Sequence, residues 1–388
     1  MMEAWEKIRL GDACKTNTDS YSPKEGWDFV NYLDTGNITD NRIDSIQHID
    51  VKNEKLPSRA RRKVKKNSII YSTVRPNQRH FGIIKSQPKN FLVSTGFAVI
   101  DTDAQVLDAD FLYYLLTQAA FVESLHAIAE QSTSAYPSIK PSDIEDLEIE
   151  IPDLATQKKI AGILGSLDRK ITKNTELNEN LQEQAQTLYA NMFIHNASDQ
   201  WIEGVLSDVA DITMGQSPKG DTYNEDGVGT VFFQGRGEFG FRFPTRRLFT
   251  TDPKRMAQSN DVLMSVRAPV GDLNVAYEPC CIGRGLGAIR SKDNHQSFVL
   301  YTVFSLRGKL DMFNGEGTVF GSINRDALNL MPIIIPPKDE MDRFEEIVAP
   351  MDAVIRNNYE EICRLEAIRD SLLPRLMSGE LDVSALDL

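Results

Sequence analysis

The sequence lacks the features that mark membrane and secreted proteins. No apolar run approaches the ~20 residues that are needed to cross a bilayer. The N-terminal stretch 1–7 has no apolar segment of the kind found in secretory signals. The four cysteines form no Cys-x-x-Cys pair, so neither a disulfide framework nor a redox motif is indicated. We therefore expect a cytoplasmic protein of a reducing compartment, without a membrane partner.

Motifs of catalytic and cofactor sites are also missing. The five histidines show no metal-ligand spacing, and there is neither a Gly-x-Ser-x-Gly elbow nor a Gly-x-x-x-x-Gly-Lys-Ser/Thr phosphate loop. No Asn/Asp-Pro-Pro-aromatic run, which holds the target amine in amino-methyltransferases, is present. One Gly-x-Gly-x-x-Gly occurs at 235–240, but Phe241-Arg-Phe-Pro244 follows it where a dinucleotide site requires a helix. The sequence predicts no catalytic residue and no metal or cofactor bound by this chain, and an Arg-bearing loop at 235–240.

Charge is unevenly distributed along the chain. The net charge of −13 argues against nucleic acid as a partner if it is taken alone. Residues 52–89, however, contain twelve Lys and Arg against one acid, and residues 236–255 contain six against two acids. A phosphate backbone responds to such local positive surfaces. The alternative for each run is a solvated basic loop, but their occurrence in two equivalent halves of the chain favours nucleic-acid binding.

An internal repeat organises the whole sequence. Residues 143–195 and 326–379 correspond at an offset of 184, and each copy continues from a strand-like run ending in Pro into a long helical pattern. The matched residues in this part are Ile149 and Ile333, Pro152 and Pro336, Asp168 and Asp352, Ile171 and Ile355, and Asn174 and Asn358. The repeat extends outward at offsets of 184 to 196, matching Trp5 with Trp201, Asn67 with Asn260, Arg75-Pro76 with Arg267 and Pro269, Gly96 with Gly285, Tyr114 with Tyr301, and Ser138 with Ser322.

The repeat predicts four regions and the fold class. We expect globular domains at 1–150 and 197–333 and helical regions at 151–196 and 334–388. Short strand-like runs alternate with short helical patterns in the globular parts, which indicates mixed α+β domains rather than regular βαβ units. The predicted fold is therefore α+β: two mixed α/β globular domains joined by two long antiparallel coiled-coil helices, with a pseudo-twofold repeat that suits a two-sided partner such as DNA.

Each helical region carries a heptad seam. Apolar residues from Ile160 to Met192 step by four and three, and a copy of this stripe runs from Phe344 to Leu376. Neither stripe can remain exposed, so we expect the two helices to pair. Asn174 and Asn358 occupy equivalent seam positions and are predicted to set the helix register, with solvent exposure as the alternative. Pro374 is expected to kink or end the second helix near Leu373.

The helical regions resemble a known family. The segment Ile151-Pro-Asp-Leu-Ala-Thr-Gln-Lys-Lys-Ile-Ala-Gly-Ile-Leu-Gly-Ser-Leu-Asp-Arg-Lys-Ile171 and the ending Leu372-Leu-Pro-Arg-Leu-Met-Ser-Gly-Glu-Leu381 resemble the conserved regions of the specificity subunits of type I restriction–modification enzymes. The resemblance covers the whole chain. The sequence departs from the family pattern at Asp153, where a second Pro is usual, and at Met341, which replaces the Gln found at position 157 in the first copy.

The resemblance implies a non-catalytic DNA-recognition subunit. The two globular parts would be target-recognition domains that each read one half of an asymmetric bipartite site in double-stranded DNA, and the helices would set the spacer. Two modification (methyltransferase) subunits would dock on the helices, carry S-adenosylmethionine and methylate a flipped adenine in each half-site. Restriction subunits, which use ATP and Mg²⁺, would join the same core.

Candidate DNA-binding residues follow from side-chain chemistry, because Arg favours guanine edges and Asn or Gln favours adenine. In the first domain these are Arg75, Asn77 and Arg79, with Lys63, Lys65 and Lys66 on phosphates and Thr133 and Tyr136 in a second loop; in the second domain they are Gln234, Arg236, Arg267, Arg284 and Thr318. The alternative for each is a surface ion pair, and the Arg–Pro elements are alternatively shared scaffold.

Two other functions are open at this stage. A methyltransferase or nuclease that acts alone would need the cofactor or metal motifs that are missing. A coiled-coil adaptor that binds only protein would show no DNA specificity, and its binding to DNA would not depend on salt.

Overall fold

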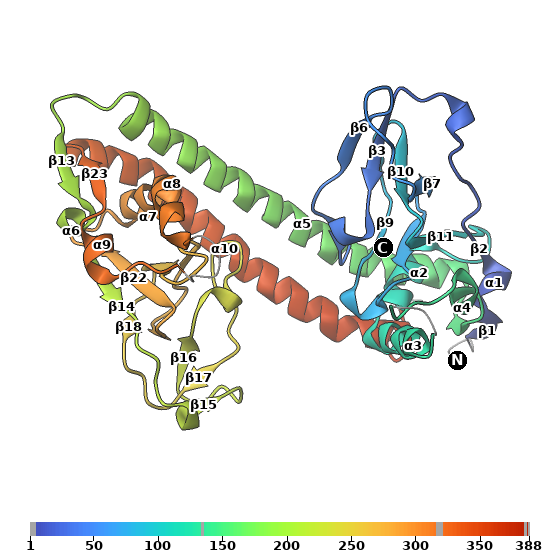
Figure 1. Cartoon of the computed structure of the whole chain (residues 1–388). Helices are drawn as coiled ribbons and strands as arrows, with labels where there is room; N and C mark the ends of the chain where they lie inside the picture. Colours follow the sequence, from blue (N-terminus) through green and yellow to red (C-terminus); the bar gives the residue numbers. More distant parts are fainter. Residues whose placement is uncertain (1–4, 133–135, 316–320, 384–385, 387–388) are drawn as a thin grey trace. The chain divides into compact units, whose positions relative to one another are not determined.

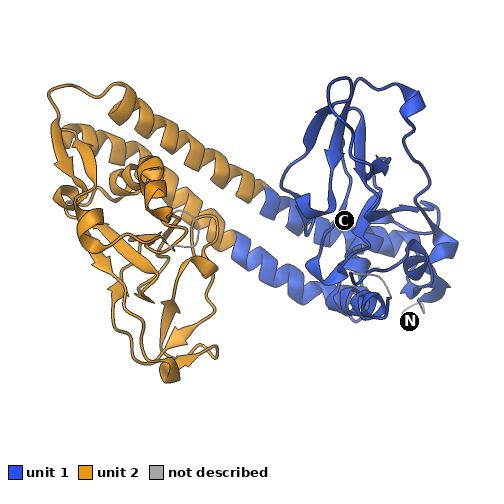
Figure 2. Ribbon diagram, in the orientation of Figure 1, with its two compact units in different colours: residues 1–172, 362–388 blue, residues 173–361 orange. Residues whose placement is uncertain are grey.

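The computed structural model describes residues 5–132, 136–315, 321–383 and 386. The chain divides into two compact units, unit 1 with residues 1–172 and 362–388 and unit 2 with residues 173–361 (Figure 2). Each unit contains one globular part and one length of each of the two long helices, α5 (Leu154–Ala190) and α10 (Lys338–Met377) (Figure 1). No helix in these described ranges is both long and apolar enough to span a membrane.

Unit 1 contains two four-stranded sheets. One has the order β2 (Cys14–Thr16), β11 (Phe97–Thr102), β8 (Ile69–Ser72) and β9 (Phe81–Ile83), with antiparallel neighbours. The other has the order β6 (Gln47–Asp50), β3 (Phe29–Leu33), β10 (Phe91–Ser94) and β7 (Ala60–Arg62), and its β3–β10 pair is parallel. Strand β1 (Glu6–Arg9) pairs with β12 (Glu148–Ile151), which immediately precedes α5.

Unit 2 repeats this arrangement. The sheet β14 (Ala210–Met214), β22 (Leu286–Ser291), β19 (Val262–Ser265) and β20 (Leu273–Val275) matches the first sheet of unit 1 strand for strand. The second sheet has the order β15 (Tyr223–Asn224), β17 (Phe249–Thr250), β16 (Thr230–Phe233), β21 (Cys280–Ile282) and β18 (Met256–Ala257), and its β16–β21 pair is parallel. Strand β13 (Ile202–Val205) pairs with β23 (Pro332–Ile335), which precedes α10.

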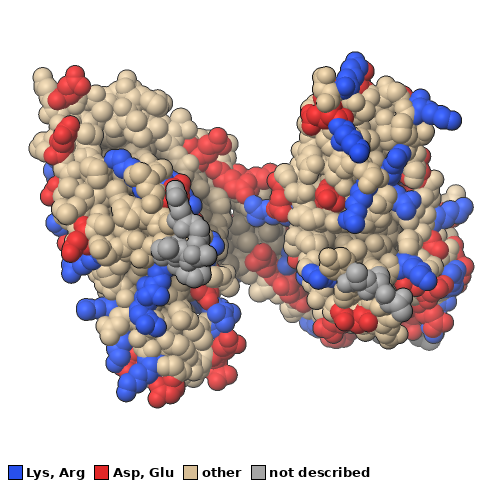
Figure 3. All heavy atoms as spheres, viewed as in Figure 1, with Lys and Arg blue, Asp and Glu red and all other residues tan. Residues whose placement is uncertain are grey.

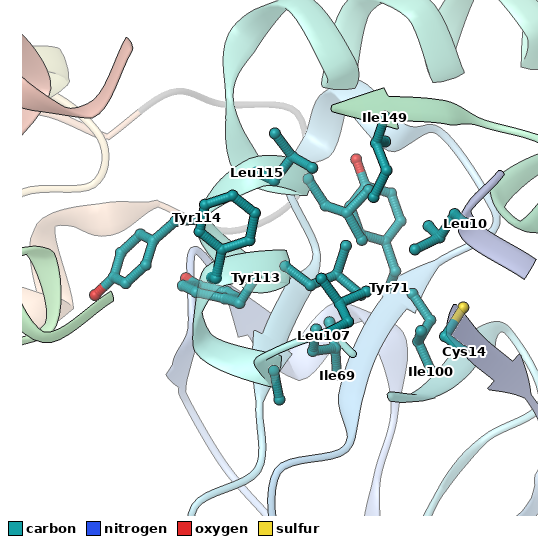
Figure 4. Close-up of a cluster of buried hydrophobic side chains, with 14 of the residues drawn as sticks. Leu10, Cys14, Ile69, Tyr71, Ile100, Leu107, Tyr113, Tyr114, Leu115 and Ile149 are labelled. Carbon is teal, nitrogen blue, oxygen red and sulfur yellow. The ribbon is translucent and has the colours of Figure 1, made fainter. Parts of the chain in front are cut away.

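The first sheet of each unit is buried on both faces. Ile69 and Tyr71 of β8 pack into the cluster that includes the helices, whereas Ile70 between them packs into a separate cluster with Phe91 of the second sheet. Figure 4 shows Ile69 and Tyr71 among residues from α2 (Ala109–Thr117) and β12. A strand covered on both faces needs a continuous apolar run, which is why β8 and β19 do not alternate with polar residues.

Equivalent contacts attach each globular part to a long helix. In unit 1 the Tyr114 hydroxyl donates to Asp168 of α5 at 2.6 Å, and in unit 2 the Tyr301 hydroxyl of α7 (Gln296–Ser305) donates to Asp352 of α10 at 2.9 Å. In unit 1 the fully buried Gln157 side chain also accepts from the Asp108 amide at 2.8 Å.

The helices pair in opposite directions within each unit. In unit 1 Asp168 of α5 is 3.1 Å from the Arg369 guanidinium of α10. In unit 2 the Asn358 amide donates to the Asn178 carbonyl oxygen at 2.8 Å, and the Asn174 amide donates to Glu361 at 2.7 Å. Partner numbers fall on one helix as they rise on the other, so the predicted antiparallel pairing is confirmed. Whether Asn174 and Asn358 set the register remains a prediction, although Asn174 is buried in the seam.

Pro374 was expected to kink or end the second helix near Leu373, and the expected end is wrong. Helix α10 continues through Pro374 to Met377. Proline lacks the amide hydrogen that would bond to the Asp370 carbonyl, so the helix loses one hydrogen bond in the turn before Pro374. Burial of Leu376 and Met377 in the core of unit 1 offsets that loss. Gly379, at a φ of +73°, then ends the segment against the Trp5 indole.

Candidate nucleic-acid interface

In unit 1 the first three candidates lie on one turn after β8. Arg75 and Arg79 flank a short 3-10 helix, Pro76–Gln78, and both have positive φ angles, 47° and 57°. Left-handed backbone is uncommon for Arg and often occurs at functional sites. The Arg75 amide donates to the Pro137 carbonyl at 3.0 Å, and the Arg75 guanidinium lies 5.5 Å from the centre of the exposed Tyr136 ring. The structure therefore brings Arg75, Asn77, Arg79 and Tyr136 together, while Thr133 lies outside the described residues.

Several basic candidates of unit 1 already have acidic partners. Arg79 is 2.6 Å from Asp40, and Lys65 is 3.2 Å from Asp101. Lys63 is 2.7 Å from Glu25, and the hydrogen bond between them raises the pKa of the Lys63 ammonium. A phosphate would have to compete with these carboxylates, whereas the exposed Lys66 forms no ion pair with any residue in the described ranges.

In unit 2 three loops meet at the end of the parallel strand pair. The Gly283 amide, after β21, donates to the Phe233 carbonyl of β16 at 2.8 Å, and the Gln216 amide, after β14, donates to the Ile282 carbonyl at 2.9 Å. The Arg284 amide donates to the Ser217 hydroxyl at 3.2 Å. These bonds place Gln216, Gln234 and Arg284 around Gly283, and we call these three exposed side chains the Gly283 cluster.

Glycine is required where these loops meet. A Cβ on Gly283 would lie 2.8 Å from the Gln234 Cα, and a Cβ on Gly215 would overlap the Gly283 carbonyl oxygen. Only backbones without side chains can approach this closely. The three loops are therefore held tightly together while their polar side chains extend outward.

The remaining candidates of unit 2 differ in how they are engaged. Arg236 is 2.6 Å from Asp272, which also binds Arg307 at 2.8 Å, and these residues line an open depression of about 410 Å³. Arg267 is exposed and has no acidic partner among the residues that the structure describes; the Val266 amide beside it donates to the Gly285 carbonyl at 2.9 Å. Thr318 lies outside the described residues.

The sequence match of Arg75 with Arg267 does not hold in the structure. Val74 forms a β-bridge with Ser138, and Arg267 forms the corresponding bridge with Ser322. Arg267 therefore occupies the position of Val74, and Ala268 that of Arg75. The two prolines that follow, Pro76 and Pro269, are equivalent, so the shared element is the proline turn and not the arginine.

Sequence reasoning missed Gln216. Its signal was a polar residue between Gly215 and Ser217-Pro218, directly after a strand, but only the packing of Gly215 on Gly283 shows why that position matters. Basic side chains do not form a continuous patch on the face drawn in Figure 3, where they are interspersed with acidic ones on both units. In the described ranges, no group of three His, Cys, Asp or Glu side chains is arranged to hold a metal ion.

The family model for the type I restriction modification DNA specificity domain matches residues 2–183 and 198–367. The chain belongs to this family. The chain is similar to a putative type I restriction enzyme MjaX specificity subunit of Methanocaldococcus jannaschii, with 28% identity over 406 residues that span 98% of this chain and 94% of that protein. The HindI specificity subunit of Haemophilus influenzae is 24% identical over 466 residues, spanning 98% of this chain and 100% of that protein.

A solved structure shows the same fold. The type I restriction–modification S subunit from M. genitalium aligns with a TM-score of 0.63 and 18% identity over 96% of both chains. The predicted α+β fold with two helix-joined globular parts and the resemblance to type I specificity subunits are thus both confirmed, as is the expected role of the chain as a DNA specificity subunit.

Proposed function

We propose that each globular domain of this specificity subunit reads one half of an asymmetric, bipartite target in double-stranded DNA. The observation that supports the proposal most strongly is the combination of equal mounting and unequal surfaces. Tyr114 and Tyr301 attach the two domains to the helices by the same contact. The loops after the parallel strand pairs differ, because the residue that follows the first strand of the pair is Asp34 in unit 1 and Gln234 in unit 2. Two unlike domains on a repeated frame suit a two-part site whose halves differ.

The long helices would set the spacer between the half-sites. Removing one facing heptad from each, residues 174–180 and 356–362, shortens the paired helices by ~10.5 Å at ~1.5 Å per residue. That length equals about three base pairs at ~3.4 Å each. We therefore expect the preferred spacer to shorten by about three base pairs. Binding should also weaken, because three base pairs turn the DNA by about 100° whereas a heptad turns the helices by only about 20°, so the domains and the half-sites no longer face each other as well.

The catalytic work would belong to other subunits. Two methyltransferase subunits would bind the helices and carry S-adenosylmethionine, and restriction subunits would supply ATP- and Mg²⁺-dependent cleavage. This chain would bind no cofactor and catalyse no step, and the complex would act in the cytoplasm.

The test is to co-express the chain with the methyltransferase subunits of its own host and to sequence the methylated motif. The proposal predicts a bipartite motif, an altered spacer with unchanged half-sites in the heptad-deleted variant, and no methyl transfer by the isolated chain. Methylation by the chain alone would contradict it. DNA binding by the complex that does not vary with salt would instead support an adaptor that binds only protein.

A further inference from the structure

Most arginines in the basic run of unit 2 are engaged by acids. Arg236 pairs with Asp272, Arg242 with Asp352 and Arg247 with Glu238, at 2.6, 3.1 and 2.6 Å. The side chains of the Gly283 cluster differ, because Gln216, Gln234 and Arg284 are exposed and form no hydrogen bond or ion pair with the described part of the chain. A ligand can engage them without displacing an internal partner.

The cluster is positioned by backbone contacts on both sides of Gly283. Gly283 and Gly285 donate to the carbonyls of Phe233 and Gln234 at 2.8 and 3.2 Å, and the Gln216 amide donates to the Ile282 carbonyl on the other side. The three side chains therefore project from one rigid point at the end of the β16–β21 pair. Such rigidity suits direct recognition, because the protein groups need little ordering when they meet a ligand.

The chemistry of the cluster matches purine edges in the DNA major groove. A glutamine amide can donate to N7 and accept from N6 of adenine, and an arginine guanidinium can donate twice to guanine O6 and N7. The cluster contains no acid that would repel phosphates. Arg267 lies beside it, since the Val266 amide donates to the Gly285 carbonyl, and an exposed arginine there suits a backbone phosphate.

The same scaffold position in unit 1 carries different chemistry. In the parallel pairs, Leu33 lies opposite Val93 and Phe233 lies opposite Ile282. Asp34 therefore corresponds to Gln234, and Thr95 to Arg284. The Asp34 carboxylate accepts from the Thr35 amide at 2.9 Å, so it is engaged within its own loop. Unit 1 thus has no amide–guanidinium pair at this position.

We propose that the Gly283 cluster reads an adenine and a guanine in neighbouring base pairs of the half-site recognised by unit 2. Gln234 or Gln216 contacts the adenine, Arg284 contacts the guanine, and Arg267 holds the adjacent phosphate. The first half-site lacks this recognition, because Asp34 and Thr95 stand at the equivalent positions. This inference rests on the proposed function, that each domain reads one half-site.

The experiment uses the full chain co-expressed with its methyltransferase subunits, and the motif is sequenced for wild type, Gln216→Ala, Gln234→Ala, Arg284→Ala and Arg284→Lys. Gln200→Ala and Arg325→Ala are the matched controls, since both residues are exposed in unit 2, lie outside the cluster and have no side-chain partner among the residues described. Size-exclusion chromatography of each complex confirms assembly.

We expect Arg284→Ala to lower discrimination at one G·C pair of the second half-site by about 5- to 150-fold, which is the range for a lost bidentate contact. Gln234→Ala or Gln216→Ala should do the same at a neighbouring A·T pair. The first half-site, the spacer and both controls should be unchanged. Arg267→Ala should instead weaken methylation of all sequences equally and reduce the salt dependence of binding.

An unchanged second half-site in all cluster variants would overturn the inference while leaving the proposed function intact. So would a uniform loss of methylation without any relaxed position, which would assign the cluster to phosphates. A change confined to the first half-site would also overturn it. If wild type produces no bipartite motif, the proposed function itself fails.

Discussion

Removing the Asp352 carboxylate should destabilise unit 2 more than removing its repeat counterpart, Asp168, destabilises unit 1. Asp352 is 3.1 Å from the Arg242 guanidinium, whose side chain is only 4% exposed. The Tyr301 hydroxyl bridges them, donating to Asp352 and accepting from Arg242 at 3.0 Å. Among the residues that the structure describes, the buried Arg242 Nε has no hydrogen-bond partner and Asp352 is the carboxylate that pairs with this guanidinium.

The structure predicts a different loss in the free energy of unfolding for each of the two substitutions. Asp352→Ala leaves Arg242 buried without a counter-charge, and breaking a buried ion pair in this way typically lowers stability by about 3–5 kcal/mol. The Asp352 side chain is 21% exposed, so water partly compensates and we expect about 3 kcal/mol. In unit 1 the Arg369 side chain is 29% exposed and keeps Asp370 at 2.9 Å, so Asp168→Ala should cost about 1–2 kcal/mol, mainly the lost Tyr114 hydrogen bond.

Hydrogen–deuterium exchange resolves the two units separately. The opening free energy is measured from peptides covering α7 in unit 2 and α2 in unit 1, for wild type, Asp352→Ala and Asp168→Ala. Each variant serves as the control for the other unit, whose peptides should not change. Equal losses for both substitutions would refute the argument that burial of the arginine determines the cost.

Three further predictions concern the framework. His295 is buried, which lowers its pKa, but the hydrogen bond to Asp342 and the nearby Asp293 carboxylate outweigh this and raise the pKa above 6.5. The stabilisation by His295 is therefore full below pH 6.5 and is lost as pH rises through the raised pKa, so the urea stability of unit 2 should fall as pH rises above 6.5, and His295→Gln should flatten the curve. Asn178→Ala should lower the free energy of unfolding by about 1–3 kcal/mol, because it leaves the Asn358 amide without its acceptor. Asn178→Leu combined with Asn358→Leu removes both polar partners and should recover stability in urea. Gly379→Val should cost about 1–3 kcal/mol in thermal unfolding because its φ is +73°, whereas Ser378→Ala should have little effect.

The repeat and the helix pattern made the fold predictable to a large extent. A heptad seam identifies a long helix because burial of one stripe is a local, periodic requirement, and both α5 and α10 follow it. Pro374 misled the prediction for a tertiary reason. Whether a proline ends a helix depends on what the following residues bury, and the packing of Leu376 in the core of unit 1 is not visible in the local sequence.

The candidate site was less predictable, because exposure and pairing depend on residues distant in sequence. Lys63 and Arg236 look alike as basic residues in a loop, but their partners Glu25 and Asp272 lie 38 and 36 positions away. Composition cannot distinguish such engaged side chains from the unengaged Arg284. Gln216 was missed because its importance comes from the approach of Gly215 to Gly283, a contact between two loops that only the folded chain creates.

The two halves of the chain share the contact that attaches each domain to its long helix, but they differ in the additional contacts that support this attachment. Both domains use a tyrosine on an aspartate of the long helix, but unit 1 adds Gln157, where unit 2 has Met341 and instead uses Glu345, which accepts from the Ser297 amide at 3.1 Å. Different residues can therefore maintain the same attachment. The strand-end positions lie outside these contacts. Unit 2 can therefore carry Gln234 where unit 1 carries Asp34, which changes the exposed side chain while the attachment of the domain to its helix is kept. The strand-end side chains of a domain can therefore diverge, and its DNA specificity with them, while the contacts to the long helices remain the same.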